Sequence, residues 1–502
     1  MTIIIWSALG PIAGCRRPAC GFSSPRTLVT ALIVAVTAMF PLWAQSSNAQ
    51  TLDPANPNQS SIDALLRPVV IDRMADRYIA GASIVVVSGD RIVYKAGFGR
   101  REVFQEIPVR VDSTIWRIGS ITKVLTGVAV MQLVDRGLVR LDDDVNQYLD
   151  SVKVPDTFPR PVRVRDLLTH TGGFDQPGLG RHATSAEAVR PLEEFLAEYL
   201  RRLRPPGELA VYDTYGITLA GYLVEQVSGL TYGEYLQRNI FNPLRMSRSG
   251  ITLPPSLVRD AAVGYEFAGH WEAMPWEFMN TAPASTVNAT APDMGNFIVM
   301  LLNGGRFEGR QVLSEAAVRT MLTRQFTNDP EQPGYGLTFW ENKQFGVPAF
   351  SHGGSMTGFG ALLYLIPAQR LGVFIAYNQE SETLANEVVS RLVSALIPGS
   401  GAKPLLRAPL AVDSEVARFA GSYADAVYNH RNPDQGWRRR TVAVSVGDAG
   451  QLVFQQLSAT RVGAMAFQRP DGSLLTFREN AQGEITHMFL NQTVYERVGD
   501  TR

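Results

Sequence analysis

Two β-rich segments lie at opposite ends of a long helical region, and this arrangement constrains the fold more than any other feature. Residues 81–99 (GASIVVVSGDRIVYKAGFG) contain two apolar runs around a Gly-Asp pair, a pattern typical of a β-hairpin. Residues 350–379 contain three further short runs, whereas residues 120–345 show mostly helical spacing. Strands at both ends with helices between them predict one mixed sheet that is assembled from distant parts of the chain.

Further helices and a second domain complete the expected architecture. Helical patterns at 62–77 and 382–396 could cover one face of the sheet. A Pro/Gly-rich boundary follows at 397–413, and only short alternating segments with Gly-Asp, Asp-Gly and Gln-Gly turns come after it. These segments predict a small antiparallel β-barrel or sandwich. The predicted fold class is therefore α/β (α+β), followed by a small all-β domain.

Length and charge limit the kinds of partner. The chain has 502 residues, which exceeds one typical core and predicts two domains. It carries 47 basic and 47 acidic residues, so the formal net charge is zero. This balance gives no general electrostatic reason to bind nucleic acid or an anionic membrane, and neither is expected as a partner.

The N-terminal region predicts export. Arg26 precedes an apolar run at 27–43, and small residues suited to cleavage follow it. Cleavage after Ala49 fits best and after Ala44 second best, which would give a periplasmic or secreted protein; an uncleaved membrane anchor is the alternative. Cys15 and Cys20 lie upstream of both sites. The mature chain would then contain no cysteine, which excludes a cysteine nucleophile, a thiolate metal site and a disulfide.

A Ser-x-x-Lys segment, Ser120-Ile121-Thr122-Lys123, stands at the start of a helical pattern and has two interpretations. Ser120 occupies the position of a helix N-cap, which would make Lys123 an ordinary solvated lysine. Alternatively, Ser120 is a nucleophile and Lys123 its base, because residues three apart share one helix face and a serine hydroxyl needs a nearby base. The motif alone does not decide between these readings.

Two later clusters supply the missing context. Tyr212 stands in a loop ahead of a helix that begins near Tyr215, and His352, Gly353 and Gly354 lie on or beside a predicted strand. Taken alone, Tyr212 would be a packed aromatic residue and the Gly-Gly pair a bulge or turn.

The order of these motifs resembles the family of serine β-lactamases, penicillin-binding proteins and β-lactamase-like peptidases and esterases. The family signatures are Ser-x-x-Lys, then Tyr-x-Asn or Ser-x-Asn, then Lys/His-x-Gly. Here they are Ser120 to Lys123, Tyr212-Asp213-Thr214 and His352-Gly353-Gly354, and the resemblance spans roughly residues 60 to 398. It implies a β-lactamase/transpeptidase-like antiparallel sheet flanked by helices, with an all-helical subdomain inserted.

The resemblance also implies the roles of individual residues. Ser120 would be the acylated nucleophile, Lys123 its base and Tyr212 a proton relay. The backbone N–H groups of Ser120 and Ser355 would form the oxyanion hole. Substrate contacts would come from Thr214, His352, Gly353, Gly354 and Ser355. Neither a metal nor a cofactor is expected, and the sequence contains no Gly-x-Ser-x-Gly, His-Glu-x-x-His or Walker A pattern.

Two departures from the family pattern bear on the substrate. Thr214 stands where the family usually has asparagine, and His352 stands where the true β-lactamases have lysine. We therefore expect an exported serine hydrolase that cleaves small amide or ester bonds, with D-amino-acid peptides or short esters preferred over β-lactams. A β-lactamase and a slow-turnover penicillin-binding sensor are the alternatives.

The expected domain order has five parts. A signal peptide at 1–49 and a linker at 50–61 precede the hydrolase domain at 62–398, and a linker at 399–411 leads to a β-domain at 412–502. In the last part, FAGSY at 419–423 and a closing VYERV resemble the lipocalin-like barrel that is appended to some of these peptidases. Such a domain could mediate a homo-oligomer.

Overall fold

The computed structural model describes residues 53–343, 345–400, 406–411, 414–432, 434–436 and 438–499. The expected signal peptide and both cysteines lie outside these ranges, as do parts of the two expected linkers. The described residues belong to one compact unit that contains both expected domains. Within these ranges no helix combines the length and the apolar character that crossing a bilayer requires.

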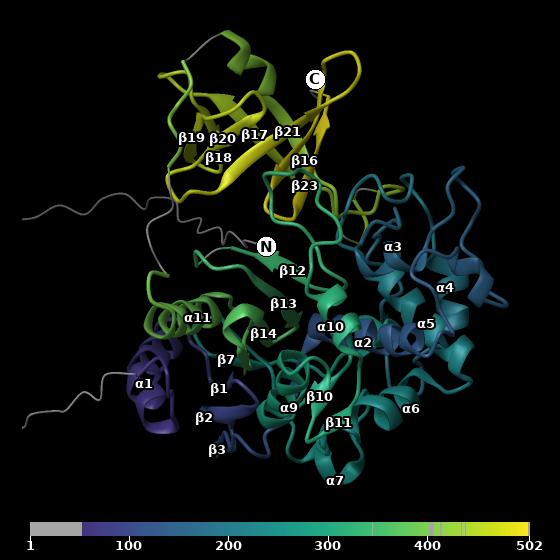
Figure 1. The fold of residues 1–502 in the computed structure, drawn as a ribbon, viewed down its shortest axis with the longest axis vertical. Coiled ribbons are helices and arrows are strands. Elements are labelled where there is room, and N and C mark those ends of the chain that lie inside the picture. Colours follow the sequence, from purple (N-terminus) through teal and green to yellow (C-terminus); the bar gives the residue numbers. More distant parts are fainter. Residues whose placement is uncertain are drawn as a thin grey trace, which may run out of the picture. The chain divides into compact units, whose positions relative to one another are not determined.

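A seven-stranded antiparallel sheet forms the centre of the first domain, which confirms the expected pairing of distant segments (Figure 1). β1 pairs with β15, so that Ala82 lies opposite Tyr377. The strands, in their order across the sheet, are β12 (Trp340–Asn342), β13 (Ala349–Met356), β14 (Phe359–Ile366), β15 (Leu371–Tyr377), β1 (Gly81–Ser88), β2 (Arg91–Glu102) and β3 (Ile107–Pro108).

Helices cover both faces of this sheet because its central strands are apolar on both sides. Successive side chains point to opposite faces, so Ile84 and Val86 join one hydrophobic cluster while Val85 and Val87 join the other. The first cluster includes α1 (Gln59–Asp76) and α11 (Thr383–Leu396), which lie together as expected (Figure 1). The second includes α9 (Ala291–Leu302).

α1 begins three residues earlier than the helical pattern indicated. The side chain of Asn58 accepts hydrogen bonds from the backbone N–H groups of Ser60 and Ser61, which are otherwise unpartnered at a helix start. The first turn therefore forms on a cap, although its residues are polar.

The helical region is organised around two buried helices, α2 (Thr122–Asp135) and α5 (Tyr215–Ser228). Residues 122 to 133 of α2 are all buried, which requires enclosure on every side. The other helices are α3 (Val164–Leu168), α4 (Leu192–Tyr199), α6 (Tyr232–Leu236), α7 (Pro255–Val258), α8 (Ala282–Ser285) and α10 (Glu315–Met321). Single 3₁₀ turns cover Gly119–Ile121, Val145–Tyr148, Pro367–Gln369 and Ser414–Phe419, and a π turn covers Gln237–Phe241.

Four small two-stranded sheets link the loops of this region. They pair β4 (Trp116–Arg117) with β9 (Asn288–Ala289), β5 (His182–Ala183) with β8 (Phe278–Met279), β6 (Tyr265–Phe267) with β7 (Trp271–Ala273), and β10 (Arg306–Phe307) with β11 (Arg310–Gln311).

The C-terminal domain is a closed antiparallel barrel, which confirms one of the two expected β architectures. Its centre is filled by one apolar cluster that includes Phe419, Phe467 and Met488. The strands are β16 (Gly421–Asp425), β17 (Thr441–Val446), β18 (Leu452–Phe454), β19 (Leu457–Arg461), β20 (Ala466–Gln468), β21 (Leu474–Glu479), β22 (Ile485–Leu490) and β23 (Thr493–Val498).

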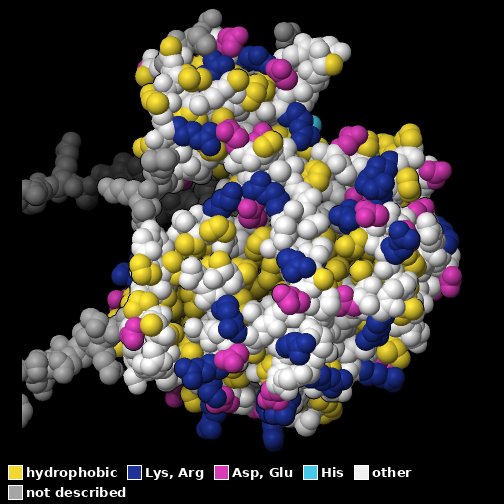
Figure 2. Space-filling model, in the orientation of Figure 1, with side chains coloured by type: hydrophobic (Ala, Val, Ile, Leu, Met, Phe, Trp, Pro, Cys, Tyr) yellow, Lys and Arg dark blue, Asp and Glu magenta, His cyan; other side chains and the backbone are white. Residues whose placement is uncertain are grey.

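Apolar and polar contacts join the barrel to the first domain. Leu209 and Val211 pack against Phe489 and Val494 of the barrel. The Gln332 amide donates to the carbonyl of Leu474 at 2.9 Å and accepts from a barrel backbone N–H. Basic and acidic side chains are interspersed over the face of the molecule in Figure 2.

Candidate active site

Ser120 lies in the 3₁₀ turn that precedes α2, and it does not cap that helix. The N-cap residue of α2 is Ile121, and no side chain caps the helix. The N-cap interpretation of Ser120 is therefore wrong. Its hydroxyl instead lies 3.1 Å from the amine of Lys123, so the two members of the first motif are in direct contact.

The turn that carries Ser120 is pressed against β13. Gly119 has a φ of +52°, and a Cβ at this position would lie 2.8 Å from the backbone nitrogen of Ser355. A Cβ on Gly354 would lie 2.0 Å from the carbonyl oxygen of Ile118. Only glycines permit this approach. Because β12 pairs with β13 no further than Ser351, the edge of β13 at residues 353–355 remains open beside Ser120. The backbone N–H of Ser355 is thus placed beside the nucleophile turn, as a two-donor oxyanion hole requires.

Lys123 is an almost fully buried lysine, with 1% of its surface exposed. Its amine donates to the carbonyl oxygen of Ala284 at 2.9 Å and contacts Ser120. Burial lowers the pKa of Lys123 well below its usual value, and the nearby positive charge of Arg181 acts in the same direction. A neutral amine beside a serine hydroxyl can accept its proton.

Tyr212 brings a second hydroxyl to the same oxygen. Its ring centre lies 4.9 Å from the Lys123 amine, and its hydroxyl lies near enough to Ser120 for the two to interact. Burial raises the pKa of Tyr212, while the hydrogen bond with Ser120 opposes that shift. Tyr212 therefore keeps its proton at neutral pH and can pass one between Ser120 and a leaving group.

Asp213 holds the start of α5 directly after Tyr212. Its carboxylate accepts the backbone N–H groups of Tyr215 at 2.8 Å and Gly216 at 2.9 Å. Its own N–H donates to His170 Nδ1, whose ring lies 4.8 Å from that of Tyr212. Burial raises the pKa of Asp213 to about 7. The helix start thereby fixes the position of Tyr212.

Thr214, the third residue of the second motif, is buried. Its N–H donates to the side-chain oxygen of Gln176 at 3.2 Å, and its carbonyl accepts from Thr218. The Gln176 amide nitrogen has no hydrogen-bond partner among the described residues.

His352 is enclosed in β13 and carries no exposed surface. Its ring stacks on Trp340 at 4.7 Å, and its Nδ1 lies 2.7 Å from the carbonyl oxygen of Gly353. The carbonyl requires a proton on Nδ1, so in the neutral ring Nε2 carries the lone pair. Burial lowers the pKa of His352 to about 3, and Lys123 adds to the shift. The third motif therefore presents an uncharged side chain at neutral pH.

The structure adds residues that sequence reasoning did not select. Trp340 stacks on His352, and His170 is buried with a φ of +58°. The Ser355 hydroxyl donates to the carboxylate of Glu380, which follows the last strand of the sheet. No sequence pattern marked Glu380, because only the sheet register brings it to Ser355. Across the described ranges, no three His, Cys, Asp or Glu side chains come together as a metal site would need.

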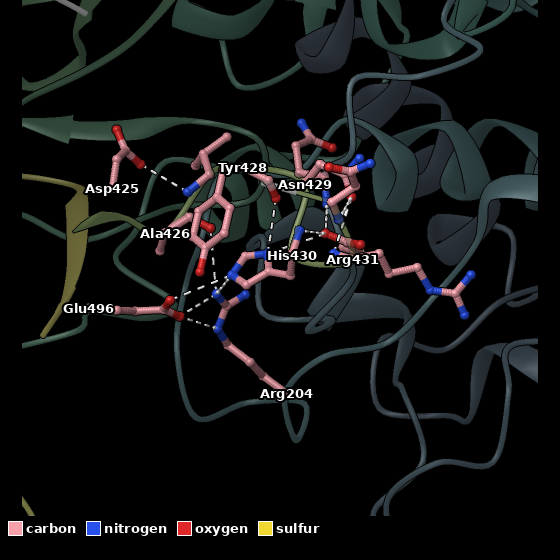
Figure 3. Close-up of polar contacts among 12 residues, drawn as sticks. Arg204, Asp425, Ala426, Tyr428, Asn429, His430, Arg431 and Glu496 are labelled. Atoms are coloured by element: carbon pink, nitrogen blue, oxygen red, sulfur yellow. Dashed lines mark hydrogen bonds and ion pairs between the residues drawn. The ribbon is translucent and has the colours of Figure 1, made fainter. Parts of the chain in front are cut away.

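A half-buried polar cluster joins the loop beside the site to the barrel. His430 lies with Nδ1 3.3 Å from Asp175 and Nε2 3.5 Å from Glu496, while Arg204 forms an ion pair with Glu496 (Figure 3). Burial lowers the pKa of His430, but its contacts with the two carboxylates outweigh burial and raise the pKa above its usual value. Asp175 directly precedes Gln176, so this cluster adjoins the residue that holds Thr214.

Fold and site together place the chain in the broad class of serine hydrolases and acyltransferases. More narrowly, the chain belongs to the beta-lactamase family: the family model described as Beta-lactamase matches residues 66–394, more than half of the chain. The resemblance inferred from the motif order is confirmed.

Several relatives share between a fifth and a third of their aligned residues with this chain. The chain is 27% identical over 373 residues to penicillin-binding protein 4 of Amycolatopsis lactamdurans, a match that covers 69% of this chain and 94% of that protein. It is 22% identical over 337 residues to protein flp of Staphylococcus aureus strain N315, covering 65% of this chain and 64% of that protein, which is less than two thirds of its length. The octameric penicillin-binding protein homologue from Pyrococcus abyssi superposes with a TM-score of 0.58 at 23% identity, over 86% of this chain and 98% of that one.

Proposed function

We propose that the protein is an exported serine hydrolase that forms an acyl-enzyme on Ser120 and cleaves small amide or ester bonds. One observation carries this proposal: the Ser120 hydroxyl contacts both a buried lysine amine with a lowered pKa and a protonated tyrosine hydroxyl. A serine with such a base at hydrogen-bond distance is an activated nucleophile.

In the proposed reaction, Lys123 takes the Ser120 proton as the oxygen attacks the substrate carbonyl. The backbone N–H groups of Ser120 and Ser355 stabilise the oxyanion that forms. The oxyanion collapses and the bond to the leaving group breaks as Tyr212 gives its proton to the departing amine or alcohol and receives the proton held by Lys123, which restores both groups. Water then attacks the acyl-enzyme, using the same base, and releases the acid.

The third motif favours D-amino-acid peptides or short esters over β-lactams. A β-lactam carboxylate is best held by a fixed cation, and His352 is uncharged at neutral pH. Thr214 also lacks the side-chain amide of an asparagine, which would bind the amide group of a lactam or peptide.

Covalent labelling tests the nucleophile. A fluorophosphonate or penicillin should modify Ser120, located by peptide mass spectrometry, and Ser120→Ala should abolish both labelling and turnover. An adduct on another serine, with Ser120→Ala fully active, would overturn the mechanism. A stoichiometric burst with no steady state would instead identify a slow-turnover sensor.

A substrate panel tests the reaction class. We expect kcat/KM for p-nitrophenyl butyrate or a D-Ala-D-Ala peptide to exceed that for nitrocefin at pH 6 and pH 8. The preference is wrong if nitrocefin is the best substrate at both pH values.

The apolar run at 27–43 supports export. The mature protein should begin at Gln50 or Gln45, which N-terminal sequencing of the secreted or periplasmic form would determine.

A further inference from the structure

Glu380 reaches the open edge of β13 from the far side of two strands. Ser355 of β13 lies opposite Gly360 of β14, which in turn lies opposite Tyr377 at the end of β15. Glu380 follows three residues later, and its carboxylate accepts a hydrogen bond from the Ser355 hydroxyl. The ring of Tyr377 occupies the space over Gly360, where a Cβ would lie 2.3 Å from a ring carbon.

The contact is exposed to solvent and adjoins the turn that carries Ser120. Ser355 and Glu380 are both exposed, while the backbone of Ser355 packs against Gly119, the residue before the candidate nucleophile. A ligand held in the candidate oxyanion hole would therefore lie beside the Glu380 carboxylate.

The other titratable groups at this edge do not cancel that negative charge. Burial keeps His352 uncharged at neutral pH and lowers the pKa of Lys123 well below its usual value. The positive charge of Arg181 acts on Lys123 and Tyr212. The site is thus polarised, with a carboxylate beside Ser355 and a guanidinium whose field reaches Tyr212.

We infer, on the basis of the proposed hydrolase function, that Glu380 is a specificity-determining residue. It favours substrates that carry an ammonium group near the reacting carbonyl, such as amino-acid amides and esters with a free amine. It disfavours substrates with a carboxylate there, because like charges repel.

Three substrates of matched shape test this inference: D-alanine p-nitroanilide, its N-acetyl derivative and its N-succinyl derivative. They place a positive charge, no charge and a negative charge near one scissile bond. In Glu380→Gln, kcat/KM should fall about threefold for the ammonium substrate and rise about threefold for the succinyl substrate, the scale of single exposed charge pairs. Their ratio should therefore change about tenfold, with the acetyl substrate nearly unchanged.

Glu382→Gln is the matched control. Glu382 lies two residues after Glu380, at the start of α11. Its carboxylate acts on the same neighbour, because burial raises the pKa of Tyr377 and the negative charges of Glu382 and Glu380 both raise it further. The Glu382→Gln substitution removes one negative charge, as Glu380→Gln does, but leaves the contact between Glu380 and Ser355 in place. An equal change in the ratio for Glu382→Gln, or an unchanged ratio for Glu380→Gln, would overturn the inference.

A second measurement separates this inference from the proposed function. Protection of Ser120 from an uncharged fluorophosphonate by D-alaninamide and by its N-acetyl and N-succinyl derivatives gives the same ratios without turnover. If Ser120 labels normally but the ratios do not depend on Glu380, only the inference fails. If Ser120 does not label at all, the proposed function fails and the inference falls with it.

Discussion

The molecule holds one buried and one half-buried cluster of titratable side chains, and it controls their charge in opposite ways. At the candidate active site, Lys123 and His352 are buried without a carboxylate in hydrogen-bond contact, and burial lowers both pKa values. At the barrel contact, Arg204 and His430 face Asp175 and Glu496, and the pKa of His430 is raised (Figure 3). Burial without a partner yields neutral, reactive groups, whereas burial with partners yields charged groups that hold segments together.

The largest expected effect comes from the neutral cluster. Lys123→Ala and Tyr212→Phe should each lower kcat by at least about a hundredfold, the scale of positioned acid–base groups. The double variant should fall little further, because groups that act as one unit are strongly non-additive. Steady-state kinetics on one ester substrate measure all three. Multiplicative losses would show that the two residues act independently.

A backbone substitution tests whether this cluster depends on the contact between the nucleophile turn and β13. Gly354→Ala places a Cβ 2.0 Å from the carbonyl of Ile118, so the turn must move, and we expect kcat to fall at least about tenfold. Gly353→Ala is the control, since its nearest neighbour would be Trp340 at 3.8 Å. Equal losses in the two variants would contradict this account.

The charged cluster should respond through stability. Glu496→Gln removes the partner of Arg204 and His430 and should lower the free energy of unfolding by about 2–3 kcal/mol in chemical denaturation. Glu479→Gln, which breaks the exposed barrel pair with Arg418, should cost less than about 1 kcal/mol. If Glu496→Gln lowers the free energy of unfolding no more than Glu479→Gln does, the charged cluster does not stabilise the fold as predicted.

The smallest effect is a pH dependence of stability. A base whose pKa is raised on folding binds its proton more tightly in the folded state. The contribution of His430 to the free energy of unfolding is therefore complete below its unfolded pKa of about 6.5. This contribution is lost as the pH rises through the higher pKa of the folded state. The stability difference between the wild type and His430→Gln should shrink by roughly 1 kcal/mol between pH 6 and pH 9.

His487→Gln provides the control for that titration. Burial lowers the pKa of His487 to about 4, below its unfolded value of about 6.5, so His487 destabilises the folded state at pH 6 and this cost is lost by pH 9. The stability difference between the wild type and His487→Gln should therefore change in the opposite direction to that of His430→Gln. An NMR titration that places the pKa of His430 at or below 6.5 would contradict the prediction.

The sequence allowed prediction of those elements whose signals lie within short segments of the chain. The hairpin at 81–99, the three strands at 350–379 and the turns of the barrel could be recognised because apolar spacing and turn residues lie within short windows. The first two motifs could be recognised for a similar reason, since each is a short segment at a helix start.

Contacts between distant segments could not be predicted in this way. Glu380 reaches Ser355 only through the register of three strands, and His430 meets Asp175 across 255 positions of sequence. Neither pair has a local signature. The role of Ser120 at the helix start was ambiguous because a serine caps helices as readily as it serves as a nucleophile. The 3₁₀ turn excludes the cap interpretation, because it moves the helix start past Ser120, and the nucleophile role stays a prediction.

The pairing of β1 with β15 has a consequence for the order of events during synthesis. The two strands are separated by roughly 290 residues, which a ribosome adds in roughly 15–60 s. Throughout that time the edge of β1 that pairs with β15 has no native partner, although the strand is apolar on both faces. The nascent chain therefore contains, for tens of seconds, an apolar strand whose final partner has not yet been synthesised.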